Sequence, residues 1–203
     1  MSNIKKYIES GILESYLLGI TNPVETNEVE QMASTYAEIK SELDKISTSL
    51  ETYAHTHAIA PNPVIKPFLM AIIDYSERMQ KGEPATFPPI LDAGSSIDDY
   101  TNWLNRADMQ PPGDFKEMFA KIIGYTPGAI TAIAWIKHMA PEEVHDNEYE
   151  KFLIIEGTCN IIVDEKVHSL TPGDYFPIPL YKNHHVQVTS AIPCKVILQR
   201  IAA

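Results

Sequence analysis

The chain has 203 residues, of which 44% are apolar and 21% charged, and its formal net charge is −11. This composition is typical of a globular protein and excludes a disordered or fibrous one. The negative charge argues against nucleic-acid binding, which needs clustered Lys and Arg, and favours a basic protein partner.

The chain carries few signals for secretion or membrane insertion. Its two cysteines, Cys159 and Cys194, both fall in expected strands, so a disulfide framework is not predicted. The N-terminus lacks the continuous apolar core of a signal peptide, and no run approaches the roughly 20 apolar residues of a membrane helix. We therefore expect a cytoplasmic protein without a membrane partner.

Helical periodicity begins at the N-terminus. Apolar residues recur at three- and four-residue spacing over residues 4–17, which predicts a first helix that stops at Gly19. Asn22 and Pro23 then predict the cap and the first turn of a second helix.

Two further helices are expected before residue 80. Residues 36–53 form the clearest apolar stripe of the chain, with charged residues around it. A fourth helix is expected after Pro61 and Pro63, where an apolar segment follows. Four short helices of this kind predict a small all-α domain over residues 1–75.

The connector over residues 76–112 contains repeated Pro and Gly, which interrupt regular structure. Within it, Ser95 or Ser96 is expected to cap one short helix, with Asp98 or Asp99 in its first turn.

Strand periodicity occupies the rest of the chain, residues 113–203. About eight short β-rich runs alternate with turns and predict an antiparallel barrel or jelly roll, so the fold class is α+β. The runs are residues 118–125, 129–138, 150–157, 158–164, 166–170, 175–179, 185–190 and 194–201.

Candidate metal ligands lie in two segments of this region, EEVHDNEYEKFLIIEG at residues 142–157 and PGDYFPIPLYKNHHV at residues 172–186. Strand alternation and the turns between the runs can bring His145, Glu150 and His184 together. Histidine with carboxylate suits Zn, Fe, Ni or Mn, so the ligand types alone do not select the ion.

These segments resemble the two motifs of the cupin family, and the likeness covers residues 115–200. Matches to the second motif are Pro172, Gly173, Asp174, Pro179 and His184. In the first motif, Glu150 and His145 match the family's glutamate and second histidine, whereas Glu143 stands where the family has its first histidine. The resemblance implies a divalent metal, with zinc as the first choice, on His145, Glu150 and His184, and with Glu143 as a fourth ligand.

The remaining histidines are expected outside this site. His185 should point to the opposite face of its strand from His184, and His168 has no partner in either motif. His55 and His57 lie roughly 200° apart around a helix, so they cannot readily share a metal.

The helical region resembles the anti-sigma domain of bacterial anti-sigma factors. The likeness lies in IESGILESYLLGITNPVETNEVEQMASTYAEIKSELDKISTSLETYA, where a helix with a YxLG-like end precedes a capped short helix and a long amphipathic one. Joined to a C-terminal cupin, it is similar to the ChrR-type anti-sigma factors, which hold an extracytoplasmic-function sigma factor inactive in the cytoplasm. Gln31, Ser34, Thr35 and Ala37 stand where such domains place zinc ligands, which implies a zinc-free helical domain.

Three hypotheses follow from the sequence. The first is a non-enzymatic regulator that sequesters a sigma factor and uses a metal-binding barrel as sensor or modulator. The second is a metal-dependent cupin enzyme, such as a dioxygenase acting on a small molecule, whose helices form a homodimer. The third is a metal-free structural or sugar-binding barrel.

Overall fold

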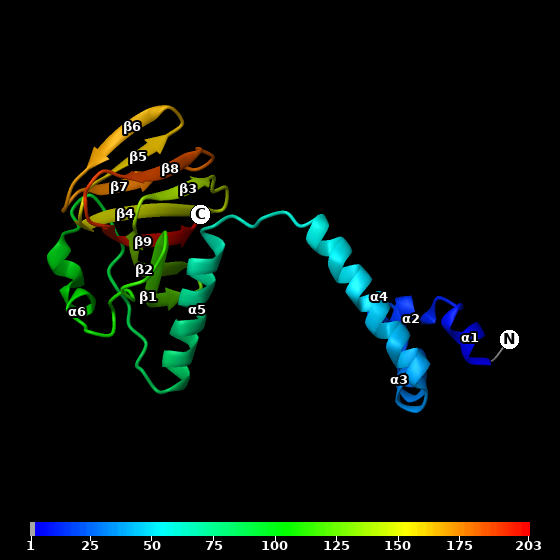
Figure 1. Cartoon of the computed structure of the whole chain (residues 1–203). Helices are drawn as coiled ribbons and strands as arrows, with labels where there is room; N and C mark the ends of the chain where they lie inside the picture. The colour runs from blue at the N-terminus through cyan, green and yellow to red at the C-terminus, as the bar shows by residue number, and fades with distance from the viewer. Residues whose placement is uncertain (1–2) are drawn as a thin grey trace. The chain divides into compact units, whose positions relative to one another are not determined.

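The computed structural model of the protein describes residues 3–203. It divides them into two compact units, one up to Ala60 and one from Pro61 to Ala203. Helices precede two facing β-sheets along the chain, which confirms the expected α+β class (Figure 1).

The first unit is helical throughout. Leu13, Val29 and Ile39 are fully buried at its centre and make up its small core. Its helices are α1 (Asn3–Ile8), α2 (Ile12–Leu17), α3 (Pro23–Thr35) and α4 (Ala37–Thr56).

Local sequence accounts for the ends of these helices. The expected first helix is broken into α1 and α2 at Gly11, whose φ of 81° is in the left-handed region that glycine adopts at little cost. The predicted cap of α3 is confirmed, because the Asn22 side chain accepts hydrogen bonds from the backbone of Val24 and Glu25. The Glu25 side chain in turn accepts from the Asn22 N–H, which completes a capping box.

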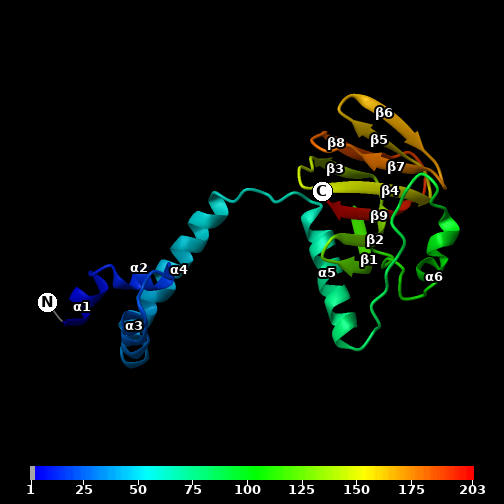
Figure 2. The same ribbon diagram turned by 180° about the vertical axis from the view of Figure 1, so that it is seen from behind.

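The second unit contains two antiparallel sheets. One has the strand order β1-β2-β9-β4-β7 and the other the order β3-β8-β5-β6. Figures 1 and 2 both show β9, in red, between β2 and β4. The strands are β1 (Met118–Thr126), β2 (Ala129–Ile136), β3 (Met139–Glu143), β4 (Glu148–Glu156), β5 (Cys159–Val163), β6 (Lys166–Leu170), β7 (Tyr175–Ile178), β8 (His184–Val188) and β9 (Cys194–Ala202).

Strand β3 lies where the sequence predicted only a turn. Its pairing with β8 is interrupted between Ala140 and Glu143, around Pro141. Proline cannot donate a ladder hydrogen bond and is tolerated in a strand mainly at an edge or an irregularity. Because of this proline, the sequence pattern did not predict the short edge strand. Its last residue, Glu143, pairs with His184.

Helix α5 (Ile65–Gln80) belongs to the second unit, so the division between units differs from the boundary expected at residue 75. It packs alongside β1 (Figure 2), and its Ala71, Phe68 and Tyr75 join the apolar core between the two sheets. This helix completes the barrel, because it buries apolar residues that the sheets leave uncovered.

Charged groups fix the C-terminal half of α5 to the barrel. Asp74 accepts hydrogen bonds from Arg78 at 3.0 Å and from Lys121 of β1 at 2.6 Å. Arg78 also pairs with Glu83, which in turn pairs with Arg106. Side chains far apart in sequence thus form one partly buried network.

The connector after α5 covers the outer face of the five-stranded sheet. The expected short helix is present as η1 (Ile97–Tyr100) followed by α6 (Thr101–Leu104), and Ser96 caps it. Tyr100 and Met109 are fully buried there against Ile133 and Ile197. Both faces of this sheet are therefore packed, which explains its nearly continuous apolar strands.

Cys159 and Cys194 are both buried free thiols. Among residues 3–203, no helix combines the length and the apolar character needed to cross a bilayer.

We predict that Asp74→Asn lowers the free energy of unfolding of the barrel unit and makes this free energy depend less on pH in the acid range. Burial alone would raise the pKa of Asp74, but hydrogen bonds from Lys121 and Arg78 outweigh it and hold the pKa below its ordinary value. A carboxylate whose pKa is lower in the folded state than in the unfolded state stabilises the fold at pH values above the unfolded-state pKa. This stabilisation is lost as the pH falls through the folded-state pKa. Urea unfolding between roughly pH 5 and pH 2, followed by the fluorescence of Trp103 and Trp135, checks this.

Glu77→Gln is the matched control for this prediction. Glu77 lies on the same helix, but its ion pair with Lys81 is exposed to solvent. The control should reproduce the wild-type pH profile, and an equal flattening in both variants would contradict the role of Asp74.

Candidate metal centre

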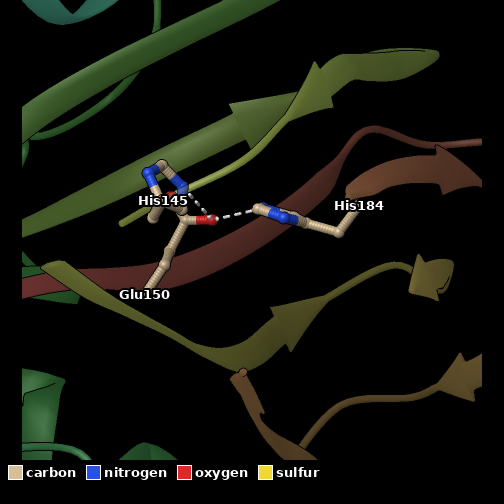
Figure 3. Close-up of side chains that lie close together, drawn as sticks. All are labelled: His145, Glu150 and His184. Carbon is tan, nitrogen blue, oxygen red and sulfur yellow. Dashed lines mark hydrogen bonds and ion pairs between the residues drawn. The ribbon is translucent and has the colours of Figure 1, made fainter. Parts of the chain in front are cut away.

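Three residues from separate segments meet between the two sheets. Glu150 lies on β4 of the five-stranded sheet, His184 begins β8 of the four-stranded sheet, and His145 lies in the loop between β3 and β4. One ligand atom from each of the three lies within 4.8 Å of the others (Figure 3). The structure therefore brings together three of the four residues expected from the sequence.

Distances within this cluster are short. Nε2 of His184 lies 3.0 Å from Oε2 of Glu150, and Nε2 of His145 lies 3.5 Å from the same oxygen. The two imidazole centroids are 5.2 Å apart. Glu150 and His184 are each only 3% exposed. A carboxylate so deeply buried requires partners of opposite charge or a metal.

Backbone groups fix the loop that carries His145 and orient the ring of His184. The N–H of Tyr181 donates to the carbonyl of His145 at 2.8 Å, which ties the β3–β4 loop to the loop before β8. Nδ1 of His184 lies 3.2 Å from the carbonyl of Lys182. When Nδ1 donates to this carbonyl, Nε2 points its lone pair at the cluster, as in many metal-binding histidines.

The donor set fits a divalent metal. Nε2 of His145 is buried and lacks a hydrogen-bond partner, although it faces the other two ligand groups. Ligand atoms that share a metal at about 2.0–2.2 Å must lie close together, and the separations of 3.0 and 3.5 Å allow this. A metal held by these atoms would satisfy the unpaired nitrogen of His145.

Glu143, the fourth candidate, is engaged differently. Its Oε2 lies 3.5 Å from Nε2 of His145 but accepts a hydrogen bond from Nη2 of Arg200 at 2.8 Å. Glu143 is therefore a neighbour of the three-residue cluster and not a member of it.

Arg200 is a site residue that sequence reasoning missed. Its Nε donates to Oε1 of Glu150 at 2.9 Å, directly across the β4–β9 pairing. A signal was present, because Arg200 continues the two-residue spacing of Cys194, Val196 and Leu198 along β9, and these three side chains lie in one apolar core. A charged residue at an inward position of an apolar strand indicates a buried ionic partner.

The charges of this network shift its pKa values. Burial acts to raise the pKa of Glu150, but the neighbouring imidazoles of His145 and His184 and the charge of Arg200 hold it well below its ordinary value. Burial raises the pKa of Glu143 despite the nearby guanidinium. The carboxylate of Glu150 raises the pKa of His145 against the opposing effect of burial.

The other histidines lie apart from the cluster. His168 of β6 contacts the ring of Phe176 at 4.6 Å between centroids, and His57 stacks on Tyr53 at 4.1 Å. His55 is exposed. His185 is half-buried and lies beside the interior space of the barrel, although it is not part of the ligand cluster.

Comparisons with known proteins found one matching family model and several similar solved structures. Residues 135–199 match the family model described as a cupin domain. Similar solved structures include KdgF from Halomonas sp., at 15% identity and a TM-score of 0.41 over 47% of this chain and 92% of that one. The protein TT1209 from Thermus thermophilus has 17% identity and a TM-score of 0.42, over 45% of this chain and 90% of that one. The cupin domain of Cnp3 from Schizosaccharomyces pombe has 10% identity and a TM-score of 0.41, over 44% of this chain and 67% of that one.

No match to this sequence was found among curated proteins. The assignment of a cupin domain therefore rests on residues 135–199.

We predict that Arg200→Met destabilises the metal-free barrel by about 3 kcal/mol, because it leaves two poorly exposed carboxylates without their cation. The measurement is urea unfolding at neutral pH in the presence of a chelator. Lys182→Met is the control, since it breaks an exposed pair with Asp164 and should cost less than about 1 kcal/mol. Equal effects of the two substitutions would contradict the structural importance of Arg200.

Proposed function

We propose that this protein, in which residues 135–199 form a cupin domain, is an anti-sigma factor. Its helical unit binds an extracytoplasmic-function sigma factor, and its barrel binds a divalent metal, with zinc as the first choice, as a sensor or modulator. The proposal combines the resemblance of the helical region to anti-sigma domains with the physical properties of the two units.

Exposed apolar side chains support the partner-binding half of the proposal. Leu18, Ile20 and Val24 lie around the α2–α3 turn and are 59%, 73% and 76% exposed, and Tyr53 of α4 is 64% exposed. Among the described residues of this unit, only the three core side chains are buried apolar groups. An apolar surface of this kind on a small helical unit is typical of a site that docks another protein.

Charge favours a basic partner over a second copy of the same chain. Residues 1–60 contain nine acidic side chains against four lysines. Two such units would repel each other, whereas a basic surface on a sigma factor would be attracted and would associate faster.

Electrostatics of the barrel support a divalent cation. The carboxylates of Glu143, Glu148 and Glu150 surround the guanidinium of Arg200 at 2.8–3.5 Å. With neutral histidines this leaves an excess of two negative charges, which one divalent ion would balance. His145, Glu150 and His184 would hold the ion, which would act as a Lewis acid with open coordination positions.

The small interior of the barrel favours a sensor over an enzyme. The space beside the cluster measures only about 20 Å³, and its walls are mostly apolar. A cavity of this size holds roughly one water molecule and leaves no room for an organic substrate. This observation carries the choice of a regulatory role over the enzymatic hypothesis.

We predict that protein purified without a His tag contains about one equivalent of divalent metal per chain and that His145→Ala loses most of it. Elemental mass spectrometry of the dialysed protein measures this and identifies the ion. His168→Ala is the control, because His168 lies on β6 outside the cluster and should retain the metal. A wild-type protein that stays metal-free after incubation with excess zinc would contradict metal binding.

We predict that the protein co-purifies with a sigma factor encoded beside its gene and that Leu18→Asp with Val24→Asp weakens this complex by about 2 kcal/mol or more, roughly 30-fold. The acidic side chains would place unpaired charge in the apolar contact. Calorimetric titration of the purified proteins provides the affinity.

Ile192→Asp supplies the matched control for the sigma-factor experiment. Ile192 is similarly exposed, at 53%, but lies in the barrel unit before β9. It should leave the affinity unchanged. Failure of the wild-type protein to bind any neighbouring sigma factor would reject the anti-sigma role.

A further inference from the structure

The interior of the barrel has a polar end and an apolar remainder. Glu150, His184, Glu143 and Arg200 line one end of the small cavity. Apart from His185, the remaining walls are apolar side chains from both sheets, and they include Ile136, Phe152 and Leu198 of the five-stranded sheet and Ala140 and Val186 of the four-stranded sheet. A ligand that filled this space would need an apolar body and a single polar head directed at the cluster.

Two residues at the beginning of α5 line this interior. Val64, which is 5% exposed, and the half-buried Phe68 both line the cavity. The guanidinium of Arg200 lies over the ring of Phe68, 4.7 Å from its centroid. Since the same guanidinium bonds Glu150 and Glu143, the aromatic ring contacts the group that surrounds the metal ligands.

Helix α5 is held unequally along its length. Among the described residues, the ion pairs of α5 involve only residues from Asp74 onward, in the C-terminal half of the helix. At the other end, Val64 occupies the N-cap position without a side-chain cap, and the Asn62 side chain accepts a hydrogen bond from the Val64 N–H. Asn62 reaches the barrel through a 3.5 Å contact to the carbonyl of Glu142. The first turn can therefore move more easily than the last.

We propose that Phe68 and Val64 determine which ligands reach the cluster. With α5 in place, the interior admits a ligand of about the size of water. A larger ligand, with an apolar body and one donor atom, enters only when the first turn of α5 moves outward. This inference deepens the proposed function, because residues 57–64 directly connect α4 to this turn. Entry of such a ligand would thus alter the segment that joins the two units.

Chemical modification of histidine in the metal-free protein tests the closure without requiring a metal. Diethyl pyrocarbonate reacts with accessible imidazole nitrogens, and peptide mass spectrometry follows His184 against the exposed His55 as internal reference. His184 should react slowly in the wild type and at least about tenfold faster in Phe68→Ala, because protection depends on local opening. Leu69→Ala, at a neighbouring position that is 52% exposed, should leave the rate unchanged.

The fluorescence of Trp103 and Trp135 shows whether Phe68→Ala keeps its folded barrel. Val64→Ala removes less volume from the same wall and should raise the rate in the same direction by a smaller factor. The proposal is overturned if His184 reacts as fast as His55 in the wild type, or if folded Phe68→Ala and Val64→Ala both retain the wild-type rate.

Pyridine, which has an apolar ring and one donor atom, tests ligand entry in the Co²⁺-loaded protein. Its addition should change the visible absorption of the Phe68→Ala protein and leave that of the wild type unchanged. A change of equal size in the wild type would overturn the closure. Absence of Co²⁺ binding would instead reject the metal site, while the histidine modification still decides the role of α5.

Discussion

The buried carboxylate of Glu150 is the constraint on which the second unit depends. A charge at 3% exposure between two apolar sheets is stable only when fixed partners surround it. Arg200 contacts one of its oxygens from the neighbouring strand, and His184 contacts the other from the opposite sheet. The pairing of the sheets and the position of the β3–β4 loop are therefore tied to one side chain.

Helix α5 links this centre to the rest of the chain. Its ion pairs through Asp74 fix it to β1, while its first turn places Phe68 under Arg200. The helix therefore covers the interior of the barrel and also begins directly after the segment that leads from α4. In the proposed regulator, this one helix would adjoin both the metal site and the connecting segment, so the metal and the partner protein would not need to be in direct contact.

The barrel could be predicted largely because strand alternation is local. Eight of the nine strands lie at or near the expected residues, and the missed strand contains Pro141 within a five-residue edge. The helices before residue 60 were found from their apolar spacing, but the break at Gly11 was not. His145, Glu150 and His184 were all identified from motif spacing, and the structure places them together.

The sequence by itself determined the order of helices and strands and three candidate ligands, because both depend on periodicity and spacing within short segments. Only the tertiary structure assigned α5 to the barrel. The apolar residues of this helix suit packing against other helices as well as against β1, and the local sequence does not distinguish the two. The tertiary structure also paired Glu143 and Glu150 with Arg200, which lies 57 and 50 positions away along the chain. The closure by Phe68 likewise depends on packing between segments that are distant in sequence, and no local pattern encodes such a contact.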